Sequence, residues 1–70
     1  MDGINTIMWI VKSLIDINKD WIIQRLDIHR VEDLYHYFYK ATLWMIVDGE
    51  RRQMIIYDSG QFSFEEEEEI

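Results

Sequence analysis

Residues 41–57, with the sequence ATLWMIVDGERRQMIIY, decide the fold. Residues 41–47 and 53–57 are short apolar segments rich in β-branched and aromatic side chains, which favour strands. The dipeptide Asp48-Gly49 lies between the two segments and is typical of a hairpin turn. The stretch therefore predicts an antiparallel β-hairpin.

Two registers are compatible with this hairpin. A two-residue loop would set Trp44 opposite Gln53, whereas a four-residue loop over residues 48–51 would set Met45 opposite Met54. We favour the four-residue loop because it pairs apolar residues with apolar residues on one face of the hairpin.

The segment that follows the hairpin predicts a third strand. The Asp58-Ser59-Gly60 tripeptide is a turn signal, and residues 61–65 then alternate, with Phe62 and Phe64 on one face. Three consecutive strands joined by short turns predict a small antiparallel meander.

The segment that precedes the hairpin predicts helices. Apolar residues recur at helical spacing over residues 4–17, in a stripe wider than one packing face requires. A weaker helical pattern over residues 21–37 predicts a second helix, or two helices with a bend near His29, although the aromatic residues 34–39 favour a strand. The expected fold class is α+β, with N-terminal helices packed on the antiparallel β-meander.

Chain length predicts a homodimer. Residues 1–64 are expected to form a single small α+β domain, and residues 65–70 an acidic C-terminal tail or strand extension. The chain has 70 residues and no Cys, so it cannot use disulfides, and small domains without them often gain stability by oligomerisation. Hydrophobic residues make up 49% of the chain, which is more than a single small core can bury. An isologous dimer interface is therefore expected to cover the remainder.

The net charge of −7 limits the classes of partner. Phosphate groups attract Lys and Arg, so neither nucleic acid nor an anionic membrane is expected to bind directly. The apolar runs are far shorter than the ~18 residues of a membrane-spanning helix, and the start of the chain lacks the basic segment of a secretory signal. We expect a soluble, cytoplasmic protein with a basic partner.

Motifs for catalysis or cofactor binding are not found in the sequence. His29, Glu32 and His36 would share one face if this segment were helical, but a surface pair between Glu32 and His36 explains the spacing more simply than a metal site does. The aromatic residues around Trp44 would suit stacking with single-stranded nucleic acid, but the negative net charge favours core or dimer contacts. We predict no enzyme activity, no cofactor and no metal site.

The acidic C-terminal run is the most unusual feature. It consists of Glu65, Glu66, Glu67, Glu68 and Glu69, and the net charge is −7 with these five residues and −2 without them. An extended chain would carry one negative charge per roughly 3.3 Å, close to the spacing of about 3.4 Å between phosphates along a DNA strand. Further carboxylates, Asp27, Glu32 and Asp33, are candidate additions to this surface.

In size, acidity, lack of cysteine and C-terminal glutamate run, the chain resembles small acidic phage-encoded DNA-mimic inhibitors, including those directed at the bacterial nucleoid-associated protein HU. The resemblance implies a homodimer in the bacterial host cell whose acidic surface blocks the DNA-binding face of a basic protein. It also implies that Glu65 to Glu69 bind the partner, with Asp27, Glu32 and Asp33 as additions. The alternative is a homo-oligomeric structural or adaptor module whose acidic tail only aids solubility.

Overall fold

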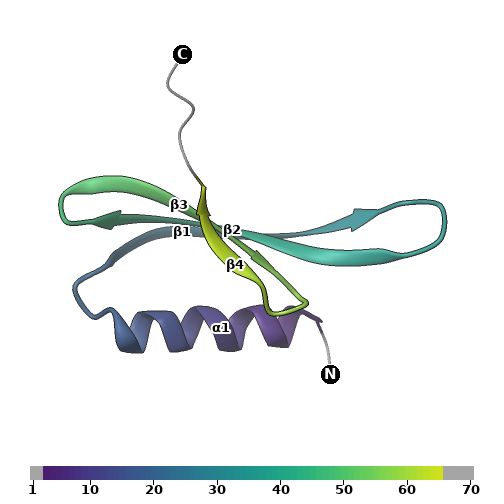
Figure 1. Ribbon diagram of the computed structural model, residues 1–70, viewed down its shortest axis with the longest axis horizontal. Coiled ribbons are helices and arrows are strands. Elements are labelled where there is room, and N and C mark those ends of the chain that lie inside the picture. Colours follow the sequence, from purple (N-terminus) through teal and green to yellow (C-terminus); the bar gives the residue numbers. More distant parts are fainter. Residues whose placement is uncertain (1–2, 66–70) are drawn as a thin grey trace, which may run out of the picture.

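One helix precedes a four-stranded sheet in the computed structural model, which describes residues 3–65 (Figure 1). The elements are α1 (Gly3–Ile17), β1 (Ile22–Glu32), β2 (Tyr37–Val47), β3 (Glu50–Tyr57) and β4 (Phe62–Glu65). The strands form an antiparallel meander in the order β1-β2-β3-β4. The predicted α+β class and an antiparallel meander are confirmed, but the meander has four strands and not the predicted three. The described part of the chain contains no helix long and apolar enough to cross a bilayer.

The predicted second helix is wrong, because its segment forms β1, which pairs with β2 along its whole length. A β-bulge explains the misleading periodicity. The register shifts between Ile23 and Arg25, so that Ile23 pairs with Met45 while Leu26 pairs with Leu43. The bulge thus sets Ile23 and Leu26, three residues apart, on the same face of the sheet, which is the spacing that indicates a helix.

The favoured four-residue loop between β2 and β3 is also wrong. The structure has the two-residue register, with Trp44 opposite Gln53. The turn residues Asp48 and Gly49 have φ angles of 52° and 81°. Positive φ at both central positions is the geometry of a type I′ turn, a two-residue hairpin turn whose twist matches the flanking strands, so the turn itself selects this register.

The observed register places Met45 opposite Arg52, a pairing that apolar matching disfavours. Arg52 is partly exposed, and its guanidinium carbon lies 4.2 Å from the centroid of the Phe64 ring on β4. A cation over an aromatic face is attracted by the ring quadrupole, while the aliphatic stem of the arginine covers apolar surface. Arg52 therefore occupies an inward-facing position without burying an unpaired charge.

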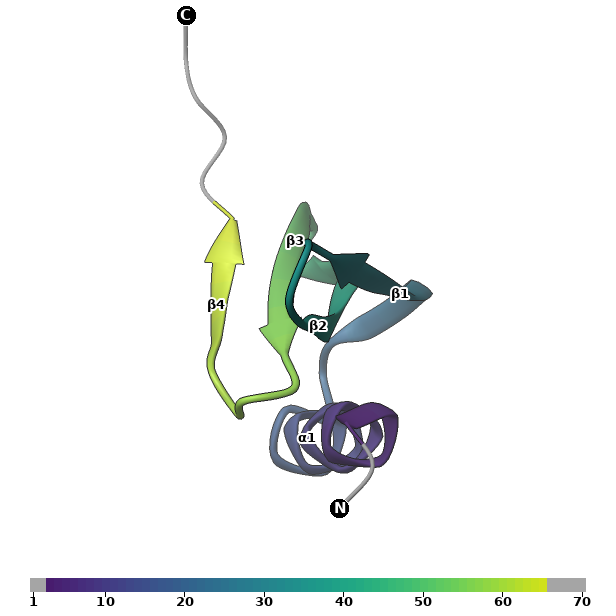
Figure 2. The same ribbon diagram turned by 90° about the vertical axis from the view of Figure 1, so that its right-hand side faces the viewer.

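The helix α1 covers one face of the sheet and packs mainly on β2 (Figures 1 and 2). The core consists of buried residues from α1, β2 and β3, namely Ile7, Ile10, Val11, Ala41, Leu43, Met45, Met54 and Ile56. Because side chains alternate along a strand, the same strands send their other residues to the opposite side of the sheet. We call that side, which carries Trp44 and Gln53, the open face.

We expect the Leu43→Ala substitution to lower the free energy of unfolding by about 3 kcal/mol, because Leu43 is fully buried and a cavity would remain. The matched control is Leu34→Ala, since Leu34 is 91% exposed and its truncation should cost less than about 0.5 kcal/mol. Urea unfolding of both variants measures the difference. Equal losses would contradict the described core.

Candidate functional site

The predicted carboxylates of the folded body lie on different sides of the sheet. Asp27 is opposite Thr42 on the open face, whereas Glu32 is opposite Tyr37 on the side that carries α1. Asp33 follows β1 in the turn that leads to β2. The fold therefore does not bring these three carboxylates together into one acidic patch.

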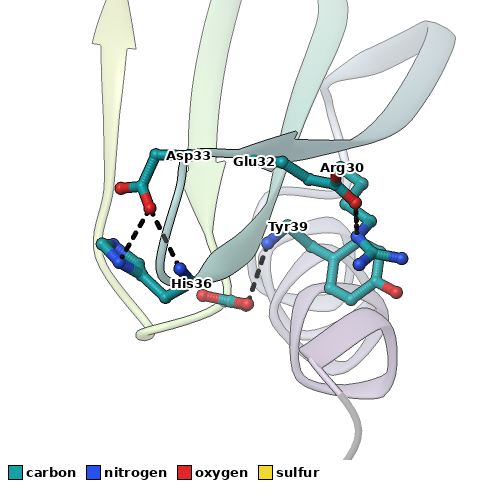
Figure 3. Close-up of polar contacts among 6 residues, drawn as sticks. Arg30, Glu32, Asp33, His36 and Tyr39 are labelled. Carbon is teal, nitrogen blue, oxygen red and sulfur yellow. Dashed lines mark hydrogen bonds and ion pairs between the residues drawn. The ribbon is translucent and has the colours of Figure 1, made fainter.

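Two of these carboxylates form ion pairs with arginines of their own strand. Arg25 Nη2 lies 2.9 Å from Asp27 Oδ2. Arg30 Nε lies 2.6 Å from Glu32 Oε1, the pair that Figure 3 shows. Residues two apart on a strand share a face, so both pairs follow directly from the strand conformation of this segment. Each arginine compensates the field of its carboxylate locally.

Asp33 shapes the turn between β1 and β2. Its Oδ1 accepts hydrogen bonds from the backbone N–H groups of Tyr35 at 2.8 Å and His36 at 3.0 Å. The same oxygen lies 3.2 Å from His36 Nδ1, and Figure 3 shows both contacts with His36. An aspartate that binds backbone N–H groups two and three residues ahead is a turn-forming arrangement. Asp33 therefore has a structural role within the hairpin.

The helical face proposed for His29, Glu32 and His36 does not exist. His29 lies opposite Lys40 on the open face, whereas Glu32 lies on the side of α1 and His36 in the turn. Within residues 3–65, no three His, Asp or Glu side chains are grouped so as to hold a metal ion.

Glu65 is the first residue of the acidic run and the last residue of β4, where it lies opposite Gln53. In the amide orientation that satisfies both neighbours, Gln53 donates a hydrogen bond to Glu65 Oε2 at 2.8 Å and accepts one from Trp44 Nε1 at 3.2 Å. Arg25 completes the row, with its guanidinium carbon 5.0 Å from the Trp44 ring centroid. This row of four side chains crosses all four strands on the open face and fixes the side chain with which the run begins.

The acidic run carries most of the net negative charge of the chain. Residues 3–65 carry seven Lys or Arg and nine Asp or Glu, a net charge of −2 that includes Glu65. The predicted partner-binding residues Glu66, Glu67, Glu68 and Glu69 lie outside the described residues. They add four negative charges immediately after β4.

The Gln53→Ala substitution should loosen the end of β4, because it removes the side chain that joins Trp44 to Glu65. We expect faster hydrogen exchange at the Ser63 and Glu65 amides and a loss of unfolding free energy below about 1.5 kcal/mol. The control is Gln24→Ala, which removes an exposed glutamine at the bulge on the opposite edge strand. Unchanged exchange in β4 would show that the row does not hold Glu65.

Comparison of the chain with protein-family models, with curated proteins and with solved structures finds no match in any of the three.

Proposed function

We propose that this protein is a non-enzymatic DNA mimic that binds the DNA-binding surface of a basic host protein, with HU as the first candidate, and blocks DNA binding there. The segregation of charge supports this proposal. In the folded body, Asp27 and Glu32 are paired with arginines, whereas five consecutive glutamates begin at the end of β4. A basic partner would therefore meet its strongest attraction at this one end of the chain.

DNA mimicry depends on a spacing between successive carboxylates that matches the spacing of phosphates, and the extended conformation of Glu65 supports this spacing. Glu65 belongs to a β-strand, in which the chain advances about 3.3 Å per residue, and β4 is an outer strand of the sheet. The acidic run thus starts from an extended residue at the edge of the domain. Carboxylates at that interval reproduce the linear charge density of one DNA strand, with about 3.4 Å per phosphate.

Specificity beyond charge would come from Phe62. This residue lies on β4 three residues before Glu65, on the side of the sheet that carries α1, and is 49% exposed, whereas Phe64 packs against Trp21 with ring centroids 5.7 Å apart. Long-range attraction steers association and is screened within about 8 Å at physiological salt, while an apolar contact depends little on salt. The exposed ring of Phe62 would provide that short-range contact.

Neutralising the acidic run by converting Glu65 to Glu69 into Gln should weaken competition with DNA at least tenfold, or about 1.4 kcal/mol. The measurement is displacement of a fluorescent DNA duplex from purified HU over a series of salt concentrations. For the unmodified protein, the competition should fall steeply with salt, and the variant should lose most of that dependence.

A charge-matched control separates the run from net charge. Converting Asp2, Asp16, Asp20, Asp48 and Glu50 to their amides also removes five charges but leaves the run and the predicted partner-binding carboxylates intact, so competition should persist. Equal loss in both variants would assign the effect to net charge alone. Unchanged competition without the run would favour the alternative function, a structural or adaptor module with a solubilising tail. An unmodified protein that displaces no DNA would exclude HU as the target.

A further inference from the structure

The strand β1 forms an outer edge of the sheet and is much longer than the strand at the other edge. It has 11 residues, compared with four in β4. Backbone groups along an edge strand that point away from the sheet are free to pair with another strand. The edge of β1 is therefore the larger of the two surfaces available for strand addition.

The hydrogen-bond phase shows which residues of β1 point outward. Asp33 donates its backbone N–H to the carbonyl of His36 at 3.0 Å, which marks a hydrogen-bonded pair between the two strands. Such pairs recur at every second residue of an antiparallel ladder. The intervening residues Leu26, Ile28 and Arg30 therefore direct their N–H and C=O groups away from β2.

An apolar flank of α1 lies on the same side of the molecule as the β1 edge. Seen from its N-terminus, a right-handed helix turns about 100° clockwise per residue, so Met8 and Ile15 lie roughly a quarter turn clockwise from the inward-facing Ile7 and Leu14. Figure 2 views α1 from its N-terminal end, with β1 on the right and β4 on the left. The clockwise flank is thus the one beside β1.

This flank is exposed and hollowed. Met8 and Ile15 are 46% and 37% exposed, and they contribute to a groove of about 410 Å³. The groove is lined by Met8, Trp9, Val11, Lys12, Ile15 and Asp16. All of these residues belong to α1, and the groove lies on the flank of the helix toward β1. A partner that adds a strand at β1 would approach this flank, which offers it side-chain burial.

We propose that a second copy of the chain covers this surface, with β1 antiparallel to the β1 strand of the partner subunit and the α1 flanks facing each other. The pairing would join the two sheets into one, with both helices on the same side. Its interface would be isologous, so each subunit supplies the same edge and the same groove.

The charges on β1 select one register for this pairing. The regular part of the strand follows the bulge, and a two-fold axis at Ile28 uses seven of its residues, 25–31. Asp27 then lies opposite the partner's His29 in both halves of the interface, where the imidazole can donate a hydrogen bond to the carboxylate. Ile28 meets Ile28 of the partner subunit at the axis.

Neighbouring registers are less favourable. A two-fold axis at Asp27 sets this carboxylate opposite Asp27 of the partner subunit, and an axis at Arg30 sets two guanidinium groups opposite each other. An axis at His29 sets two imidazole groups opposite each other and loses both Asp27–His29 pairs. Like charges directly opposite on a sheet are destabilising. An axis at Leu26 leaves only residues 25–27 of the regular strand in the ladder. The strand is thus self-complementary about Ile28, and this property favours a second copy over an unrelated partner.

Reciprocal exchange of Asp27 and His29 tests the register. Asp27→His alone sets two imidazoles opposite each other across the interface, and His29→Asp alone sets two carboxylates opposite each other. Each single variant should weaken dimerisation at least tenfold. The double variant restores the pair with its members exchanged and should recover the dimer. Sedimentation equilibrium measures the mass, which is 8.6 kDa for one chain and twice that for a dimer.

Substitution on α1 tests the groove. Met8→Lys should weaken the dimer at least tenfold, whereas Ile17→Lys should not, because Ile17 lies on the flank of α1 toward β4 and is 78% exposed. In the dimer, the outward amides of Leu26, Ile28 and Arg30 should also exchange slowly. A protein that is monomeric at millimolar concentration would overturn the proposal, and so would a dimer unaffected by the Asp27, His29 and Met8 variants. The dimer does not depend on the acidic run, so the variant with Glu65 to Glu69 neutralised should keep its mass.

Discussion

Burial of the central strand β2 is the constraint on which the rest of the structure depends. Ala41, Leu43 and Met45 are all fully buried under α1, and the alternation that points them inward also sends Trp44 to the open face. Because β2 pairs with β1 on one side and β3 on the other, its register fixes where every side chain of both neighbours lies. The row from Arg25 through Trp44 and Gln53 to Glu65 follows from that register together with the pairing of β3 and β4.

The sequence predicts the parts of this fold in which alternation is unbroken. The strand at residues 41–47 and the shared face of Phe62 and Phe64 are confirmed, because nothing interrupts the two-residue period there. The strand β1 was not predictable from periodicity, since its bulge sets Ile23 and Leu26 at helical spacing. The register of the hairpin was mispredicted because apolar matching of β2 and β3 considers neither the turn residues Asp48 and Gly49 nor the contact of Arg52 with Phe64 on β4.

For the candidate site, the sequence likewise predicts only the part that lies on a strand with unbroken alternation. Glu65 is the last residue of β4, as the alternation over residues 61–65 predicts. The local pairing of Asp27 and Glu32 was missed because it requires a strand, in which residues two apart share a face. On a helix, the same residues would point in different directions from Arg25 and Arg30. Because a helix was predicted where β1 forms, Asp27 and Glu32 were expected to bind a partner and not to pair with the arginines of their own strand.

The two sheet edges differ in a way that connects the two proposals. The edge at β1 is long and self-complementary, whereas the edge at β4 is short and is followed by glutamates, whose mutual repulsion would oppose strand addition there. A dimer joined at β1 would therefore close rather than grow, and its strand order would leave a β4 strand at each end. Seven interstrand steps of about 4.8 Å would separate these ends by at most about 34 Å. Two acidic runs held at opposite ends of one sheet would engage a two-fold symmetric basic surface simultaneously, and avidity would then strengthen contacts that are weak singly.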